Sequence, residues 1–329
     1  MSVKPRAMRD AFLERIHGAM ASDETIFFVS ADFGSPVLDK IRADFGNRFV
    51  NVGIAEQNLI NVSAGLALEG YKVFAYAIAP FITMRCFEQI RVSLALLSQV
   101  RPMNVNLIGV GAGYSYVVSG PTHQCYEDLT IMRALPTVQV LSPSDHVLAG
   151  ALFDHCATQT GPKYLRFDAQ VLPVLYGQGA PDLGNGFHRL RTGKEICLLA
   201  TGFMTHTALR AADALVKEGI EVAVMDLFAI SDFDEAALAR MLADYQGIVT
   251  LEEGFRARGG VDALLLDFFN RSGGKAKLRN IGVDPGYRFE LGSRAELHEQ
   301  VSIGVNAVIA QVRDFARGLD MGVNIDTIN

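Results

Sequence analysis

The chain has 329 residues, half of them hydrophobic, and a formal net charge of −6 at pH 7. This length is sufficient for two compact domains with sizeable cores. The acidic balance, together with the lack of a long basic run, argues against nucleic acid or an anionic membrane surface as a partner. Residues 1–10 carry charges and no apolar run, so we expect no secretory signal.

The four cysteines, Cys86, Cys125, Cys156 and Cys197, are scattered and include no Cys-x-x-Cys pair. This spacing favours reduced thiols over a disulfide framework or a zinc site, so we expect a cytoplasmic protein without a metal site of its own. The longest apolar run, at about residues 74–82, contains a proline. It is shorter than the ~20 residues needed to span a bilayer.

Helix-like and strand-like segments alternate along the first half of the chain. Hydrophobic spacing predicts helices at 7–21, 36–43, 56–69, 83–97 and 144–158, and strands at 25–30, 48–52, 72–77, 104–110 and 137–142. Continuous apolar strands between helices indicate an α/β domain with a mostly parallel sheet covered on both faces.

A boundary is expected where residues 171–190 become rich in proline and glycine and lose helical spacing. We therefore predict a first domain at 1–175, a linker at 176–190 and a second domain at 191–329. The alternation restarts in the second domain, with strands at 195–201, 221–226 and 247–251 and helices at 205–217, 234–244 and 260–269. Residues after Gln311 are expected to form a frayed terminus. The predicted fold class is α/β, with two domains that each contain a mostly parallel sheet flanked by helices.

The run RFVNVGIAEQ at residues 48–57 is the most informative stretch. Its carboxylate, Glu56, follows an apolar strand and precedes a segment of helical spacing. A carboxylate at such a junction lies near helix N–H groups and can be held rigidly in a partly dry place. There it can exchange a proton with a heteroaromatic nitrogen. The alternative is a glutamate that only complements the helix dipole, worth ~0.3–1 kcal/mol.

This run resembles the signature of the pyrimidine-binding domain of the transketolase family of thiamine-diphosphate enzymes. Gly53, Ile54, Ala55 and Gln57 match the family around the carboxylate. The resemblance implies that Glu56 hydrogen-bonds the pyrimidine N1′ of the cofactor and so assists its activation. It also implies that Ile54 lines the cofactor.

A second constellation, SGPTHQ at residues 119–124, follows a predicted strand and a glycine-rich loop. Such loops lie at the carboxyl ends of strands, where open α/β sheets bind ligands. A structural histidine in an ordinary Gly-Pro turn is the alternative. The string GPTHQ resembles the motif of transketolases and deoxyxylulose-phosphate synthases. The resemblance implies that His123 faces the substrate and handles its hydroxyl groups, with Ser119 beside it.

Residues 74–91 resemble the family segment whose aromatic side chains stack on the pyrimidine ring. We predict Phe81 as the stacking ring, with Ile82 or Tyr76 sharing the pocket. A core aromatic side chain is the alternative.

Three arginines are predicted to bind substrate, because a guanidinium holds a phosphate or another anionic group by paired hydrogen bonds. Arg9 matches a family position near the substrate channel, Arg85 lies near one, and Arg166 lies where deoxyxylulose-phosphate synthases carry an arginine. Each of them is alternatively a solvated residue or an ion-pair member.

The resemblance covers about residues 7–309 and corresponds to the C-terminal half of a full-length transketolase. The diphosphate-binding half brings a Gly-Asp-Gly motif, and no such string occurs here. Since Mg²⁺ with a diphosphate needs oxygen ligands of that kind, we expect a separate subunit to supply them. The predicted assembly is a dimer of this chain completed by two partner chains, an α2β2 heterotetramer.

The implied reaction is transfer of a two-carbon ketol unit from a ketose to an aldose. Ser119 stands where typical transketolases have an aspartate, and Ala169 where they have a phosphate-binding arginine. A histidine-bearing loop is replaced by residues 110–117. These departures favour a non-standard sugar. A deoxyxylulose-phosphate-synthase-like subunit, a 2-oxo-acid dehydrogenase β-like subunit and a non-catalytic binding subunit stay open as alternatives.

Overall fold

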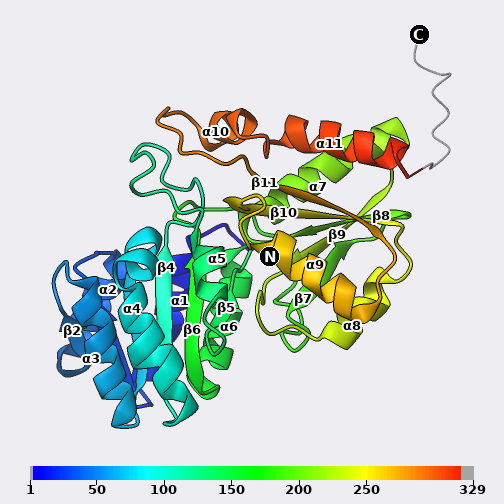
Figure 1. Ribbon diagram of the computed structural model, residues 1–329. Coiled ribbons are helices and arrows are strands. Elements are labelled where there is room, and N and C mark those ends of the chain that lie inside the picture. Colours follow the sequence, from blue (N-terminus) through cyan, green and yellow to red (C-terminus); the bar gives the residue numbers. More distant parts are fainter. Residues whose placement is uncertain (1–2, 320–329) are drawn as a thin grey trace.

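The computed structural model describes residues 3–319, which form two α/β domains side by side (Figure 1). The first domain contains a six-stranded sheet in the order β2-β1-β3-β4-β6-β5, in which every neighbouring pair is parallel. Its strands are β1 (Ile26–Ser30), β2 (Phe49–Asn51), β3 (Lys72–Ile78), β4 (Asn104–Val110), β5 (Gln139–Leu141) and β6 (Gly161–Phe167).

Helices cover both faces of this sheet, as the apolar strands require. One face carries α1 (Met8–Met20), α2 (Pro36–Asp44) and α6 (His146–Thr158), and the other carries α3 (Glu56–Leu68), α4 (Phe87–Gln89) and α5 (Asp128–Arg133). Phe12 shows how the first face is filled. Its ring contacts Phe74, Phe153 and Phe167 at centroid distances of 6.0, 6.0 and 5.3 Å. Edge-to-face aromatic contacts of this kind stabilise a core beyond the burial of their area.

The single helix predicted at 83–97 is wrong in detail. The chain instead forms π-helical segments at Phe81–Arg85 and Ile90–Leu96, with the short α4 between them and a 3-10 turn at Leu97–Gln99. Thr83 Oγ1 donates to the Ala79 carbonyl at 2.7 Å, so a side chain competes there for the backbone acceptors of a regular helix. Widened turns of this kind are frequent at functional sites.

The second domain contains a five-stranded sheet in the order β11-β10-β8-β9-β7, parallel except for the edge strand β7. Its strands are β7 (Phe187–Arg191), β8 (Ile196–Ala200), β9 (Val222–Leu227), β10 (Gly247–Phe255) and β11 (Lys277–Val283). Its helices are α7 (Phe203–Leu215), α8 (Glu235–Leu242), α9 (Val261–Ser272), α10 (Arg294–Gln300) and α11 (Val305–Arg317). The predicted fold class, two domains that each contain a mostly parallel sheet flanked by helices, is confirmed.

Two expectations about the connections are corrected. Phe187 to Leu190 were expected in the linker, but they belong to β7, because Phe187 is buried and pairs with Leu227 of β9. The expected fraying after Gln311 is also wrong, since α11 continues to Arg317 and buries Val312 and Ala316 completely. Residues 320–329 lie outside the described part of the chain.

Main-chain hydrogen bonds join the two domains at the edge of the first sheet. Ser142 N donates to the Phe228 carbonyl at 2.8 Å, and Ile230 N donates to the Val140 carbonyl at 2.8 Å. All four cysteines are free and buried. Between residues 3 and 319, no helix is long and apolar enough to cross a membrane.

Candidate active site

Glu56 is the first residue of α3 and lies where the carboxyl ends of the first sheet's strands meet. Gly53 has a φ of +75°, a left-handed conformation that lets the chain turn sharply from β2 toward the helix. Asn51 steadies the turn, because its Oδ1 accepts hydrogen bonds from Gly53 N at 3.0 Å and Asp32 N at 3.2 Å. The result is a carboxylate only 6% exposed at the carboxyl edge of the sheet.

Arg85 links this carboxylate to the predicted stacking ring. Its Nη1 donates to Glu56 Oε1 at 3.0 Å, and its guanidinium carbon lies 3.7 Å from the centroid of the Phe81 ring. The Arg85 side chain is 47% exposed, whereas Glu56 is 6% exposed. The ion pair is therefore shielded from solvent at the carboxylate and accessible at the guanidinium.

The loop between β4 and α5 places His123 next to Phe81. The imidazole lies 5.2 Å from the Phe81 ring and 6.2 Å from the Tyr116 ring, both edge to face. Thr122 Oγ1 lies 3.0 Å from His123 Nδ1 and orients the ring. Four residues from three separate segments of the sequence thus lie in one row: Glu56, Arg85, Phe81 and His123.

The other residues predicted to bind cofactor or substrate differ in how far they are exposed. Ile82 is fully buried beside the site, whereas Ile54 is 76% exposed at its rim. Tyr76 is fully buried with its ring stacked on Phe33 at 5.5 Å, so it supports the site from beneath. Ser119 is exposed on the loop that carries His123.

Arg9 lies among tyrosines, one of which, Tyr116, contacts the His123 ring. Arg9 is half-buried, its Nε donates to Asp10 Oδ1 at 2.7 Å, and its charge acts on Tyr76 and Tyr116. Burial raises the pKa of Tyr116 to about 12 even though the nearby Arg9 opposes the shift. Tyr116 is therefore a neutral hydroxyl that can donate or accept a hydrogen bond next to a cation.

Arg166 does not share this site, and its predicted contact with substrate is not supported by its position. Its side chain is 1% exposed, and its Nε donates to the buried Asp128 Oδ2 at 2.7 Å. Its Nη2 donates to the carbonyls of Cys125 and Glu253 at 3.4 and 3.0 Å. A guanidinium enclosed in this way stabilises the contact between the two domains. Of the alternatives given for Arg166, the structure therefore agrees with a member of an ion pair.

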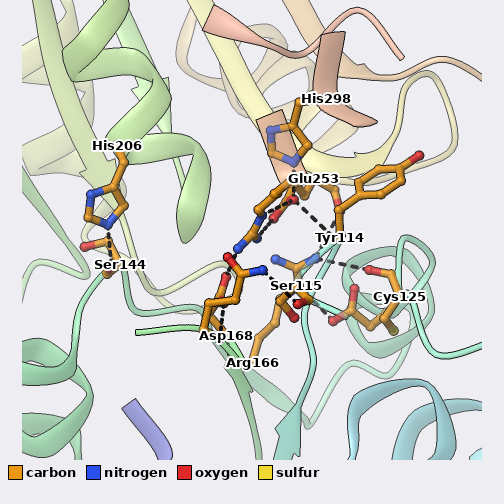
Figure 2. A network of polar contacts seen from close by, with 12 residues as sticks. Tyr114, Ser115, Cys125, Ser144, Arg166, Asp168, His206, Glu253 and His298 are labelled. Atoms are coloured by element: carbon orange, nitrogen blue, oxygen red, sulfur yellow. Dashed lines mark hydrogen bonds and ion pairs between the residues drawn. The ribbon is translucent and has the colours of Figure 1, made fainter. Parts of the chain in front are cut away.

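A buried ion cluster at the domain boundary was missed by sequence reasoning (Figure 2). Arg294 of α10 donates to Asp168 Oδ2 at 2.6 Å and, from two nitrogens, to Glu253 at 3.1 and 2.5 Å. His298 Nε2 lies 2.5 Å from Glu253 Oε1. We call Asp168, Glu253, Arg294 and His298 the boundary cluster. The capping box of Ser293 and Glu296 at the start of α10 is a sequence signal that locates the helix but not its partners.

The described residues fit one half of thiamine diphosphate. A buried carboxylate beside an aromatic face suits the pyrimidine ring, because one ring nitrogen can pair with the carboxyl group while the ring packs on the aromatic face. The diphosphate half needs Mg²⁺ and oxygen ligands. Within residues 3–319, no group of three or more His, Cys, Asp or Glu side chains could hold a metal ion.

Two family models together cover most of the chain. The transketolase pyrimidine binding domain matches residues 4–174, and the transketolase C-terminal domain matches residues 186–308. Among curated relatives, an apulose-4-phosphate transketolase subunit of Actinobacillus succinogenes is 29% identical over 92% of this chain and 96% of its own length. The 6-deoxy-6-sulfo-D-fructose transketolase subunit SqwH of a Clostridium species is 29% identical over 74% and 75%.

Solved structures agree with this relationship. A split gene transketolase described as an inactive β4 tetramer superposes with a TM-score of 0.83 at 28% identity, covering 94% of this chain and 98% of that one. A transketolase from Pichia stipitis shares the fold with a TM-score of 0.79 at 21% identity, and the match covers 47% of that longer chain. The chain therefore belongs to the transketolase family, and it comprises the family's pyrimidine binding and C-terminal domains.

Proposed function

We propose that this chain is the pyrimidine-side subunit of a two-subunit transketolase that transfers a two-carbon ketol unit from a ketose to an aldose. The observation that carries the proposal is the row of Glu56, Arg85, Phe81 and His123 at the carboxyl edge of the first sheet. The comparisons support the two-subunit part, since the chain spans 96% of a relative named as a subunit but under half of the longer transketolase.

Three residues of the row, Glu56, Phe81 and His123, have proposed roles that agree with their positions. Glu56, buried at the start of α3, hydrogen-bonds the pyrimidine N1′, and Phe81 supports the ring. When bound, thiamine diphosphate supplies the electron sink that allows a carbon–carbon bond next to a carbonyl to break. His123, half-buried 5.2 Å from the Phe81 ring, binds the sugar hydroxyls or moves their protons. Ile54 and Ile82 exclude water from the edge of the cofactor.

The diphosphate and its Mg²⁺ are held by a separate subunit in this proposal. The sequence has no Gly-Asp-Gly string, and residues 3–319 bring together no metal-binding group of side chains. Oxygen ligands are what Mg²⁺ requires, so the partner has to provide them. The site is then complete only between chains, and two copies of each subunit form the α2β2 assembly.

The substrate in this proposal is a ketose other than an ordinary unbranched pentose or hexose phosphate. Ser119 and Ala169 replace side chains that typical family members use for the sugar and its phosphate. Two relatives are named for an apulose phosphate and for a sulfo-sugar. Arg9 and Tyr116 offer a cation and a neutral hydroxyl for an anionic or branched sugar instead.

The proposal is tested by titrating thiamine diphosphate with Mg²⁺ in a calorimeter, first into this chain and then into its mixture with a diphosphate-domain subunit from the same source. Binding only in the mixture, followed by ketol transfer from one of a panel of branched, deoxy and sulfo ketoses, is the expected result. Tight binding by the chain alone would overturn the two-subunit site. Turnover of pyruvate in place of every ketose would show a synthase or a 2-oxo-acid dehydrogenase.

A further inference from the structure

A buried carboxylate of the second domain contacts the segment of the first domain that carries His123. Glu253, near the end of β10, is 1% exposed, and its Oε1 accepts a hydrogen bond from the backbone N–H of Tyr114 at 3.2 Å. Tyr114 belongs to the loop at residues 111–127, which carries Ser119 and His123. We call this segment the His123 loop.

The contact is close because the loop has a glycine where it meets the carboxylate. Gly113 has a φ of +54°, and a Cβ at this position would collide with Glu253 Cδ. Gly113 also forms a two-way main-chain bridge with Cys125, with N–O distances of 2.9 and 3.0 Å. This bridge joins the first and last parts of the His123 loop. The Glu253 carboxylate therefore contacts the loop at the point where its two ends are hydrogen-bonded to each other.

The remaining boundary cluster fixes Glu253 itself. Arg294 and His298 donate to its two oxygens, and Figure 2 shows His298 lying against the carboxylate. Burial raises the pKa of Glu253, but the charges and hydrogen bonds of Arg294 and His298 outweigh burial and hold it well below its usual range. The carboxylate is therefore a permanent anion with a fixed direction, which makes it a strong acceptor for one backbone N–H.

The same cluster touches the loop at a second point. Arg294 donates to Asp168 Oδ2, Asp168 Oδ1 accepts from Gln170 N at 2.8 Å, and Gln170 Nε2 donates to the Ser115 carbonyl at 3.0 Å. Two consecutive residues at the start of the His123 loop, Tyr114 and Ser115, are thus hydrogen-bonded to Glu253 and Gln170. Both of these partners are linked to Arg294. At the end of the His123 loop, Tyr287 of the second domain donates a hydrogen bond to Glu127 Oε1 at 2.9 Å.

From these contacts we propose that Glu253 is a positioning residue. It orders the His123 loop so that His123 faces Phe81, and it thereby couples the second domain to the handling of substrate. This inference rests on the proposed function for its kinetic consequence, whereas the ordering of the loop does not depend on it. Displacement of a catalytic side chain by about 1 Å is sufficient to reduce turnover roughly 100-fold.

The matched control is Asp226, a second buried carboxylate at the domain boundary. It accepts hydrogen bonds from Ser144, Tyr176 and Thr205 at 2.6, 2.8 and 2.8 Å. These partners come from both domains and the connection between them, but none belongs to the His123 loop. Asp226→Asn therefore weakens the domain boundary without touching the loop.

The first test uses hydrogen exchange of the full chain, read by mass spectrometry. Glu253→Gln is expected to accelerate exchange in peptides that cover 114–124 by about tenfold or more, and Asp226→Asn is expected to leave them unchanged. Unchanged exchange in Glu253→Gln, or equal acceleration in both variants, would overturn the proposal. If Glu253→Gln does not fold, His298→Asn removes a donor to the same carboxylate and should show the same pattern.

The second test is a double-mutant cycle in the two-subunit enzyme. Glu253→Gln should lower kcat/KM for the ketose roughly 10- to 100-fold in the natural background, with cofactor binding unchanged, and less than about twofold when His123 is already alanine. An equal loss in both backgrounds would show a merely structural role and overturn the proposal. Should His123→Ala itself lose nothing, the proposed function fails, and the exchange experiment still decides whether Glu253 orders the loop.

Discussion

Arg85 Nη1 lies 3.0 Å from Glu56 Oε1, so the carboxylate predicted to meet the cofactor is already paired in this chain. The same guanidinium lies over the Phe81 ring at 3.7 Å. The Glu56 carboxylate and one face of the Phe81 ring, both proposed to contact the pyrimidine, therefore share one half-exposed side chain, which would compete with the cofactor for them.

Replacing Arg85 with methionine should tighten cofactor binding. A partly exposed ion pair contributes ~0–1 kcal/mol and a cation–π contact about 0.5–1 kcal/mol, so removal of both competitors lowers Kd by up to about thirtyfold. Calorimetry on the two-subunit complex measures this. Arg91→Met, which removes an exposed arginine paired with Glu88 on the same segment, should leave Kd unchanged. Weaker binding in Arg85→Met would mean that the guanidinium contacts the cofactor.

Glu56→Gln should abolish most turnover while the subunits still assemble. An amide cannot pass a proton to the pyrimidine N1′, and acid–base catalysis contributes about 10²- to 10⁴-fold. Turnover is measured by aldose-dependent ketol transfer, and assembly by size-exclusion chromatography. Glu235→Gln is the control, since Glu235 is also the first residue of a helix paired with an arginine, Arg271, but lies in the second domain. Undiminished turnover in Glu56→Gln would refute the catalytic role.

Glu252 should make the protein less stable as the pH rises. Burial, then the nearby charge of Asp262, raises its pKa from 4.5 to about 7. Between those values the folded chain holds a proton that the unfolded chain has released, so the free energy of unfolding falls with increasing pH, by up to about 3 kcal/mol. Glu252→Gln is neutral throughout, so its advantage over the natural protein should grow from pH 4.5 to 7.

Urea unfolding at about pH 5 and about pH 8 measures this advantage. The neighbouring Glu253 provides a comparison of opposite sign, because its pKa is lowered in the folded state. Glu253→Gln should destabilise the protein by a constant amount at every pH above the ordinary carboxyl range, and by less as the pH falls below that range. Parallel behaviour of the two variants would contradict their different surroundings.

Gly113→Ala should destabilise the protein more than Gly273→Ala. Both glycines have positive φ, +54° and +69°, so each alanine costs about 1–2 kcal/mol of backbone strain. Gly273 has open space where a Cβ would stand, whereas Gly113 faces the carboxylate of Glu253. Overpacking there adds about 1–3 kcal/mol. The denaturant midpoints of the two variants provide the measurement. An equal loss of stability in both would mean that the Glu253 carboxylate does not lie against Gly113.

Local patterns predicted the parts of this molecule that local forces decide. The run around Glu56 has a strand, a positive-φ glycine and a helix start in close succession, so its geometry follows from neighbours in sequence. The two-domain α/β fold follows in the same way from apolar strands between amphipathic helices. The transketolase resemblance added His123 and Phe81, which the structure brings to the same row as Glu56.

Long-range pairing was beyond the reach of those patterns. Nothing near Arg166 in sequence indicates that Asp128, 38 positions away, will enclose it. Arg294 meets Asp168 across 126 positions and Glu253 across 41. A charged residue is usually exposed, and only the packed domain boundary reverses that expectation for these side chains. The π-helical turns at Phe81–Arg85 and Ile90–Leu96 were missed because hydrophobic spacing reports a helix but not its width.

The boundary cluster also determines where this gene can be recombined. Exchanging the second domain at the linker for one without counterparts of Arg294 and Glu253 would leave Asp168 without its guanidinium partner and Tyr114 N without its acceptor. A buried charge stripped of its counter-ion costs about 3–5 kcal/mol, comparable to the whole stability of many domains. A chimaera that keeps these contacts has to carry the His123 loop, α10 and the end of β10 from the same parent protein.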